Sequence, residues 1–458
     1  MANVCAASTE ATAPLAVTLG QFIAGARAAG LPADVEQAAS LRVLDTLAAA
    51  ASGVQQGTHA GLLALLPGDG PISIWGTPAR RGLRDAAIIN SAVAHSTYFE
   101  DGCRYTGGHP SSALIPAAFA LACERRAGGA ELLAAIAAGY EVFLRLGRAI
   151  YPSTVRRGFQ STAILAAPAT AAAAAVLLRL PAERATHAIA IACSHGAGLK
   201  AALKNAGSQP LQVGRSSEGG LLSALHAAQG ADGVPGVIEQ GFFQAFAENA
   251  RADAVTRDLG RRWGIGQTYL KLHGGCRGNH APVDAAAALS REYGCAPQDI
   301  ASMDVRVDSV TLAAEVAEPA NAGQARFSIA FSIAARLLKG DAMPARYTDA
   351  MLADPEMRAL MSRIRVRADA ALDEGYPDRR GAVIRVRTAD GRELEYALDR
   401  ALGEPETPYA QADIERKFDL TAGALYGARA DRIKTLAMSL PTLPDVNALN
   451  DLLLANPT

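Results

Sequence analysis

The stretch "AILAAPATAAAAAVLLRL", from Ala163 to Leu180, is apolar on every side until it reaches Arg179. It is mostly alanine and includes Pro168 and Thr170, so it falls short of the roughly 20 strongly apolar residues that a membrane span needs. A helix that is apolar all round in a soluble protein lies in the middle of its core. We therefore expect residues 163–180 to form a central core helix and not a membrane span.

The rest of the first half also predicts helices, because apolar residues recur at spacings of three and four. The stretch "LPADVEQAASLRVLDTLAAAASG" places Asp34 before a periodic run, and Gly53 is expected to close that helix. In "LPAERATHAIAIACSHGAGL", Pro181 lies near the expected helix start. Alanine is abundant and aromatic residues are few, which favours a compact bundle of closely spaced helices.

The pattern changes after about Lys271. Apolar and polar residues alternate in "ASMDVRVDSVTL" and "SRIRVRAD", as in half-buried strands. The stretch "GAVIRVRTADGRELEYAL" predicts a hairpin that turns at Asp390-Gly391. Between these strands, "RFSIAFSIAARLLKG" predicts a helix that ends at Gly340, and the chain becomes helical again from "TPYAQADIERKFDLTAGALYG".

These segments predict a mostly α protein, with a large all-helical domain and a smaller α+β domain. We place the helical domain at residues 1–268, the α+β domain at 269–402 and a return to the helical domain at 403–458. A chain of 458 residues, half of them hydrophobic, is long enough for two or three domains with a large core.

Charge and cysteine usage exclude several classes of partner and compartment. The net charge of −1, without a long basic run, predicts neither nucleic acid nor an anionic membrane as the main partner. The six scattered cysteines contain no C-x-x-C pair, which favours reduced thiols over a disulfide framework. The N-terminal residues lack a positive segment ahead of an apolar run. We expect a cytoplasmic protein.

The stretch "KLHGGCRGNH", from Lys271 to His280, contains two basic side chains, two histidines and a cysteine within ten residues. His273, Cys276 and His280 have zinc-type donors, but no second cluster supplies a fourth ligand and the neighbouring cations disfavour a metal. Those cations could instead activate Cys276 as a nucleophile, but a small residue packed in a tight turn is the favoured explanation. We expect no metal and no cofactor.

An anion and proton-transfer site uses more of these ten residues. Lys271 and Arg277 can hold carboxylates, the arginine with two parallel hydrogen bonds. His280 titrates near neutrality and can carry a proton, and the glycines allow the backbone to approach a ligand. A solvated basic loop before a helix remains the alternative.

A second cluster lies in "NSAVAHSTYFEDGCRYTGGHPSS", from Asn90 to Ser112. His95 has an apolar helical context and is expected to be a core histidine. His109 follows two glycines and precedes a proline, so it lies in a rigid loop near Glu100 and Asp101. A histidine placed in this way is an acid/base candidate.

Together these stretches resemble the MmgE/PrpD family over roughly residues 15 to 450. The likeness rests on "NSAVAHSTYFED", "GGHPSS", "KLHGGCRGNHAPVDAA", "RFSIAFSIAARLLKG" and "IERKF". The family includes 2-methylcitrate dehydratases, cis-aconitate decarboxylases and iminodisuccinate epimerases. The resemblance implies a helical domain with an α+β lid, a homodimer, a site between the domains and no required cofactor. It places His109, Lys271 and His280 at active-site positions.

This sequence departs from the family pattern at three polar positions. Gln160 stands where the family often has a histidine, in "RGFQST", and Gln209 and Gln212 stand at its usual lysine and histidine, in "QPLQVGR". Before the histidine loop, Tyr98 replaces the family's first aspartate. Glutamine donates and accepts hydrogen bonds but carries no proton at neutral pH. We expect a substrate with fewer carboxylates than 2-methylcitrate, or one with an amide.

The resulting hypothesis is a cofactor-independent lyase, a dehydratase or decarboxylase, acting on a small carboxylated metabolite by proton abstraction next to a carboxylate. His109 and His280 would carry protons, while Lys271 and Arg277 would bind carboxylate and stabilise an enediolate. The other predicted substrate ligands are Asp101, Arg104, Gln160, Gln209 and Gln212. The alternatives are an epimerase of a small dicarboxylate such as iminodisuccinate, and a non-catalytic family member that only binds a ligand.

Overall fold

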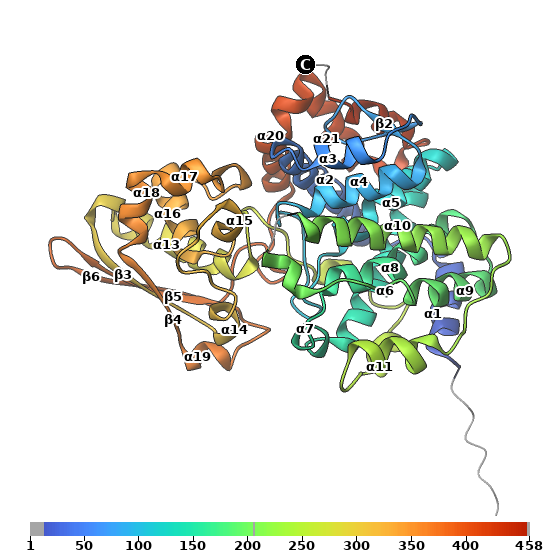
Figure 1. Cartoon of the computed structure of the whole chain (residues 1–458), viewed down its shortest axis with the longest axis horizontal. Helices are drawn as coiled ribbons and strands as arrows, with labels where there is room; N and C mark the ends of the chain where they lie inside the picture. The colour runs from blue at the N-terminus through green and yellow to red at the C-terminus, as the bar shows by residue number, and fades with distance from the viewer. Residues whose placement is uncertain (1–12, 205–206, 456–458) are drawn as a thin grey trace, which may run out of the picture.

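Helix α8 (Ser161–Leu177) crosses the middle of the larger domain, and all 17 of its residues are buried. It packs against α5 (Pro110–Arg125), α6 (Gly129–Ile150), α9 (Ala182–Cys193) and α10 (Ser208–Ala228) (Figure 1). The predicted central core helix is therefore confirmed, although it starts two residues earlier and ends three residues sooner than expected. Of the helices in the described part of the chain, none is both long and apolar enough to cross a membrane.

The computed structural model describes residues 13–204 and 207–455. The larger domain also contains the long helices α1 (Leu15–Ala26), α2 (Ala33–Gln55), α4 (Leu83–His95), α20 (Gln411–Tyr426) and α21 (Ala430–Met438). Its shorter elements are α3 (His59–Leu65), α7 (Ser153–Arg156), α11 (Phe243–Phe246), α12 (Asp253–Thr256), α22 (Asn447–Asn450), β1 (Ile72–Ser73) and β2 (Arg80–Arg81). Because α20 and α21 pack against α2, the chain does return to the helical domain after the α+β domain.

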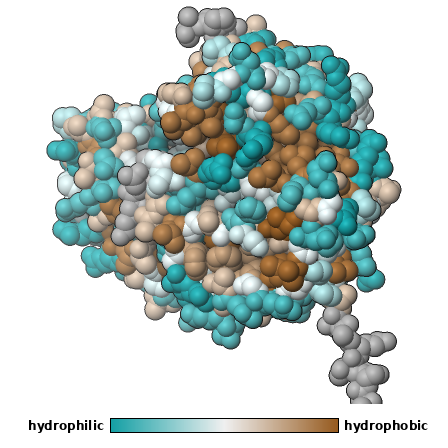
Figure 2. Space-filling model, turned by 45° about the vertical axis from the view of Figure 1, so that its right-hand side comes forward, coloured by the Kyte–Doolittle hydropathy of each residue, from teal (hydrophilic) through white to brown (hydrophobic). Residues whose placement is uncertain are grey.

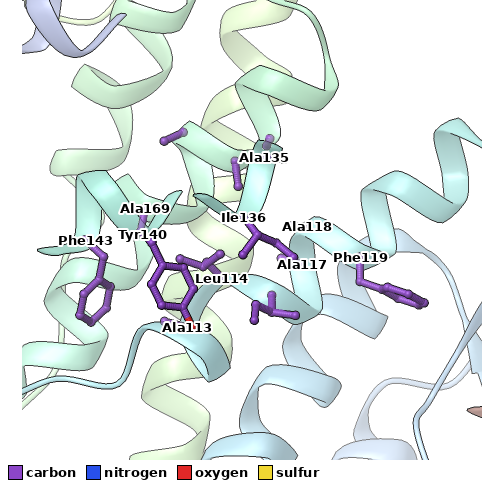
Figure 3. Packing of buried hydrophobic residues seen from close by; sticks show 14 of the residues in the cluster. Ala113, Leu114, Ala117, Ala118, Phe119, Ala135, Ile136, Tyr140, Phe143 and Ala169 are labelled. Atoms are coloured by element: carbon purple, nitrogen blue, oxygen red, sulfur yellow. The ribbon is translucent and has the colours of Figure 1, made fainter. Parts of the chain in front are cut away.

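Small residues set the spacing of the central helices. A Cβ atom on Gly220 of α10 would lie 2.1 Å from the carbonyl oxygen of Ala167 in α8. A Cβ atom on Gly139 of α6 would lie 2.9 Å from the carbonyl oxygen of Ala169. Figure 3 shows part of this packing, where alanines of α5 and α6 lie between larger side chains such as Leu114. The alanine-rich composition thus allows the closely spaced bundle that the sequence predicts.

The expected end of α2 at Gly53 is wrong. The helix continues for two residues beyond Gly53 to Gln55. A Cβ atom on Gly53 would lie 2.4 Å from the carbonyl oxygen of Val93 in α4. Gly53 therefore serves the close approach of two helices and does not terminate one.

The smaller domain is built on a four-stranded sheet with the order β4-β3-β5-β6. Its strands are β3 (Ile300–Val307), β4 (Ile364–Ala368), β5 (Ala382–Thr388) and β6 (Glu393–Leu398). β3 is parallel to β4 and antiparallel to β5, so Val305 lies between Val366 and Ile384. The predicted hairpin is confirmed, because β5 and β6 pair antiparallel on either side of Asp390-Gly391.

Two main helices pack on this sheet: α13 (His280–Tyr293) and α16 (Ile329–Lys339). As predicted, α16 ends at Gly340, which has the left-handed φ of 83° that favours glycine at a helix end. The other helices of this domain are α14 (Ser309–Leu312), α15 (Ala322–Ala325), α17 (Asp349–Ala353), α18 (Pro355–Met361) and α19 (Ala370–Asp373). Figure 1 shows the smaller domain to one side of the helical one.

Each domain has its own hydrophobic core. One core joins residues 15–270 to residues 414–453, and the other lies within residues 281–401. The mostly α fold with a smaller α+β part is therefore confirmed. The boundaries at residues 268 and 402 stay predictions. The helical core extends to Leu270, and the last core residue of the α+β domain is Ala401.

The contact between α8 and α10 predicts unequal effects for two glycine substitutions. Gly220→Ala should lower the free energy of unfolding by about 1–3 kcal/mol, because its methyl group has no room against the Ala167 carbonyl. Gly423→Ala, in α20, meets nothing within 4 Å and should leave stability unchanged or raise it by up to about 1 kcal/mol. Urea unfolding of both variants checks this, and equal destabilisation would contradict it.

Candidate active site

A cavity of about 200 Å³ lies between the two domains. The helical domain contributes His109, Gln160 and Gln209, and the α+β domain contributes Tyr376 and Arg380. Its charged lining residues are the cations Arg104, Lys200, Lys271, Arg277 and Arg380 and the carboxylate of Glu404. An excess of fixed positive charge favours an anionic ligand.

Helix N-termini add to this positive field. His109 is the residue before α5, Gln160 is the residue before α8, and Gln209 lies in the first turn of α10. Unpaired backbone N–H groups and the helix dipole make such ends favourable for anions. The central core helix thus also points its positive end at the cavity.

His109 is positioned by the glycine turn before it. Gly107 has a φ of 61°, and a Cβ atom there would lie 2.8 Å from the ring of Tyr151. The Nδ1–H group of His109 donates to the backbone oxygen of Asp101 over 2.6 Å, which leaves the lone pair on Nε2. Burial, and then the charge of Lys271, lower the pKa of His109 to about 3. His109 is therefore a neutral base at physiological pH.

Lys271 reaches the same cavity and is only 1% exposed. Its Nζ atom donates to the backbone oxygen of Tyr98 over 2.7 Å. Burial lowers the pKa of Lys271 to about 8, although the carboxylate of Glu100 opposes this shift. An ammonium with this pKa is mostly protonated at neutral pH and gives up its proton more readily than an exposed lysine.

The backbone of residues 96–99 is held by three buried cations. The carbonyl oxygen of Ser96 accepts from Arg326 over 2.7 Å, that of Tyr98 from Lys271 over 2.7 Å, and that of Phe99 from Lys417 over 2.6 Å. Tyr98 itself has a φ of 54°, a costly conformation for an aromatic residue. The three bonds hold the carbonyl groups of this loop, and we call the arrangement the carbonyl clamp.

Next to the carbonyl clamp, a chain of hydrogen bonds runs from Glu100 to Tyr98. His95 donates from Nδ1 to Glu100 over 2.6 Å and accepts at Nε2 from the Gln209 amide over 3.0 Å. The Tyr98 hydroxyl donates to the Gln209 oxygen. Burial by itself raises the pKa of Glu100, but His95, His109 and Lys271 outweigh it and hold the pKa at about 2. Glu100 is therefore a permanent buried anion beneath the cavity.

His95 is fully buried, as expected for a core histidine, and both of its ring nitrogens are hydrogen-bonded. Its ring is 5.5 Å from that of His109, and the Gln160 amide nitrogen is 3.5 Å from its Nε2 atom. The two glutamine side chains that line the cavity therefore approach the same histidine.

Two of the predicted substrate ligands lie outside the cavity lining. Asp101 is fully buried, where its carboxylate accepts from the Ser111 amide over 3.0 Å and from the Tyr140 hydroxyl over 2.9 Å. Burial raises the pKa of Asp101 to about 6. Gln212 lines a separate hollow beside α10. Their roles as substrate ligands stay predictions that this geometry does not support.

Arg277 and Arg104 both reach the cavity and share the Glu404 carboxylate, and Arg104 also pairs with Glu406. Glu404 accepts from Arg277 over 2.8 Å and from Arg104 over 3.1 Å. Arg277 also bonds to Nδ1 of His280 over 3.1 Å. His280 is fully buried outside the cavity lining, and burial followed by the charge of Arg277 holds its pKa well below the usual range. Its predicted proton-carrier role is untested, and its contacts suit the positioning of Arg277.

The zinc-type donors of the same stretch are used elsewhere. His273 pairs through Nε2 with Asp284 over 2.8 Å, while Cys276 lines the cavity. Across residues 13–204 and 207–455, no group of three or more histidine, cysteine or acidic side chains could hold a metal ion.

Several lining residues have no counterpart among the sequence predictions. Tyr376 and Arg380 come from an irregular segment before β5, and Tyr151 donates to or accepts from Tyr376 over 2.9 Å. Glu404 lies in the segment that leads back to the helical domain. None of these residues lies in a periodic segment or a recognised motif. For Tyr376 and Arg380, the only sequence signal is an aromatic residue close to two arginines in "EGYPDRRG".

The carbonyl clamp predicts that Arg326 acts on the active site at a distance. Arg326→Met keeps much of the packing but removes the bond to Ser96, so it should speed hydrogen–deuterium exchange at residues 96–101 and lower kcat/KM. Arg346→Met is the matched control, since Arg346 pairs with Asp341 on the surface of the same domain. Exchange measured by mass spectrometry checks this. Identical exchange in the two variants would contradict the clamp.

Comparison with known proteins supports the resemblance inferred from the motifs. A model of the MmgE/PrpD N-terminal domain matches residues 17–254, and one of the C-terminal domain matches residues 273–441. The chain is 26% identical to a cis-aconitate decarboxylase of Aspergillus terreus, over 92% of each chain. It is 27% identical to the cis-aconitate decarboxylase-like protein oryM of Aspergillus oryzae, over 92% of this chain and 93% of that one.

A human cis-aconitate decarboxylase is similar to a slightly smaller part of the chain. It is 26% identical over 83% of this chain and 82% of its own length. The two family models together match parts of both domains and all of the motif stretches from Asn90 to Phe418 except residues 271 and 272. This chain belongs to the MmgE/PrpD family.

Proposed function

We propose that this MmgE/PrpD protein is a carboxy-lyase that releases CO2 from a small carboxylic acid and needs no cofactor. One observation carries the proposal: in a cation-lined cavity, a protonated Lys271 with a pKa of about 8 faces the same space as a neutral His109. The relatives named as cis-aconitate decarboxylases favour the decarboxylase within the lyases.

Binding of the substrate rests on cations and amides that already line the cavity. Arg380 donates from Nε to Thr311 over 2.8 Å, which leaves its two terminal nitrogens for a carboxylate. The N-terminus of α8 supplies further N–H groups. The water molecules around a di- or tricarboxylate would therefore be replaced by fixed hydrogen-bond donors of the protein. This exchange lets an anion bind in a site from which water is excluded.

The reaction needs one proton after the carbon–carbon bond breaks. In an acid with a double bond one carbon removed from the departing carboxylate, the electron pair of the broken bond forms a new double bond. The electrons of the old double bond move onto a second carboxylate attached to its far carbon, and this group becomes an enediolate. Lys271 can donate its proton to the carbon of that enediolate and recover one from water. Its positive charge stabilises the enediolate before the transfer.

His109 suits the complementary role. Its unprotonated Nε2 atom can accept a hydrogen bond from a substrate carboxylic acid or hydroxyl group and orient it, or take up the proton that it carries. Because Asp101 binds the other ring nitrogen through its backbone oxygen, the tautomer does not depend on the charge of a side chain. Glu100 balances the positive charge that would build up around both groups.

The substrate is expected to carry fewer carboxylates than 2-methylcitrate, or to carry an amide. Gln160 and Gln209 line the cavity with neutral amides at positions where the resemblance implied a histidine and a lysine. The amide of Gln209 is engaged by both His95 and Tyr98, which fixes its orientation. A fixed amide N–H group can donate to a carbonyl or hydroxyl oxygen of the substrate, but unlike a lysine or arginine it gives no added preference for a carboxylate.

The homodimer and the cytoplasmic location stay predictions. Figure 2 shows hydrophobic residues at the surface of the molecule, between hydrophilic ones. The exposed Leu199, Leu211 and Leu222 line the hollow beside α10, and we propose this face for self-association. Sedimentation of a monomer at micromolar concentration would exclude it.

The proton-donor role of Lys271 predicts a specific pH dependence. On cis-aconitate and related di- and tricarboxylic acids, CO2 release should fall as the pH rises through about 8, because the proton donor is then lost. Lys271→Met should lower kcat/KM by about 100-fold or more. Lys271→Arg should keep binding but lose the fall near pH 8, since an arginine stays protonated.

The same assay in D2O separates the proposed lyase from its alternatives. A lyase incorporates one deuterium into the product for each CO2 released. Deuterium exchange into the substrate without CO2 would indicate an epimerase and overturn the proposal. Binding without any turnover across the panel would indicate a ligand-binding protein.

The glutamines predict a change of specificity on substitution. Gln209→Lys should raise kcat/KM for a tricarboxylate relative to a dicarboxylate by about tenfold, because a cation replaces a neutral donor at the cavity wall. Gln212→Lys is the matched control, since Gln212 lies outside that wall. Paired kinetics with both substrates check this, and an equal preference in the two variants would exclude Gln209 from recognition.

A further inference from the structure

A second cavity, of about 410 Å³, opens on the helical domain beside α6 and α12. Five arginines line it, together with two acidic residues: Arg145, Arg148, Arg251, Arg257 and Arg262, with Glu141 and Asp258. It shares no lining residue with the cavity between the domains. Whether this hollow can bind an anion depends on how many of the five guanidinium groups are already paired with carboxylates of the protein.

Two of the five arginines are used by the fold. Arg145 donates to Glu141 over 2.7 Å and to the carbonyl oxygens of Val255 and Arg257. Glu141 accepts from the Gly264 amide as well, so its charge is neutralised within the protein. Arg257 pairs with Asp253 one helical turn away. These contacts account for the positive charge of two guanidinium groups.

The other three arginines keep spare donors. Arg148 donates to the side-chain oxygen of Gln267, and Arg251 donates to the carbonyl oxygen of Arg148 over 2.5 Å. Within the described ranges, Arg148, Arg251 and Arg262 form no ion pair with a carboxylate within 4 Å. Three guanidinium groups outside ion pairs therefore face one hollow. The Asp258 carboxylate in the same lining offsets one of these charges, so two positive charges remain for an anion.

We propose that this cavity binds a small oxyanion with two or more negative charges, such as a phosphate group or a polycarboxylate. Arg148, Arg251 and Arg262 would hold the anion, each with paired N–H groups that match two oxygens. The proposal concerns a different cavity from the candidate active site and does not depend on the reaction proposed above.

Tyr105 lines this anion cavity and is the sequence neighbour of Arg104, which lines the active-site cavity. The Arg148 guanidinium carbon lies 5.4 Å from the Tyr105 ring centre, and that of Arg104 lies 5.0 Å from it. The Tyr105 hydroxyl donates over 2.5 Å to Asp378, next to the Tyr376 and Pro377 that line the active site. An anion that draws Arg148 away from Tyr105 would weaken one cation–π contact and act on the α+β domain through Asp378. The site is therefore placed to act as a regulatory site.

Titration calorimetry with the full chain at constant ionic strength tests the binding. The probes are inorganic phosphate, pyrophosphate and citrate, so the arms separate phosphate chemistry from carboxylate chemistry. We expect one saturable site for at least one probe, weakened about tenfold or more in Arg251→Gln/Arg262→Gln. Arg385→Gln/Arg387→Gln removes two exposed arginines of β5 and should leave affinity unchanged.

Three outcomes would overturn the site. They are the absence of saturable binding for every probe, equal weakening in the two double variants, and loss of binding in Lys271→Met instead, which would assign the anion to the active site. Both arginine pairs are largely exposed, so folding should survive, and equal melting temperatures confirm this.

Hydrogen–deuterium exchange tests the coupling without requiring any activity. The bound probe should change exchange at residues 376–380 in the unsubstituted chain. Tyr105→Phe keeps the ring but removes the hydroxyl that holds Asp378, so binding should persist while the exchange response disappears. An equal response in Tyr105→Phe would overturn the coupling. Because exchange is read without substrate, failure here is distinguishable from failure of the proposed reaction.

Discussion

Three buried cations, Lys271, Arg326 and Lys417, donate hydrogen bonds to the carbonyl groups of Ser96, Tyr98 and Phe99. Each cation comes from a different part of the chain, and Arg326 lies among residues of the α+β core. Charge-assisted bonds to carbonyl groups are strong in a buried setting, and an unpaired buried charge is expensive. Lys417 is further paired with Asp45 over 2.6 Å, with both side chains fully buried. The carbonyl clamp therefore ties the two domains and the returning helix α20 to one loop.

The loop held by this clamp sets the electrostatics of the cavity. It is followed by Glu100, whose carboxylate accepts a hydrogen bond from His95, and by Asp101, whose backbone oxygen accepts one from His109. The same burial that makes Lys271 a better proton donor keeps His109 neutral, because both shifts arise from desolvation of a cation. One environment thus produces an acid and a base on neighbouring groups, which is the arrangement that proton-transfer chemistry requires.

Local patterns were sufficient for most of the fold and for part of the site. The apolar run of α8, the turn at Asp390-Gly391 and the end of α16 at Gly340 follow from interactions within a few residues. The predicted end of α2 at Gly53 is wrong, because the role of this glycine depends on its contact with Val93 in another helix. Within the site, the motif positions of His109 and Lys271 lead to the cavity, whereas Glu404 and Arg380 belong to no motif and enter only through long-range contacts. Arg326 opens the motif stretch "RFSIAFSIAARLLKG", but its bond to Ser96 is a long-range contact that the motif does not indicate.

The sequence by itself determined the class of fold, the family and the chemical types available at the site, because periodicity, caps and motif spacing are local properties. Only the tertiary structure decided which of those groups work together. In the structure, Gln212 and His280 lie outside the cavity lining, and the Asp101 carboxylate accepts from the backbone amide of Ser111. The bond from Nδ1 of His109 leaves Nε2 as its free nitrogen. Proton positions and pKa values depend on burial and on charges brought together from distant segments, so no local pattern could have determined them.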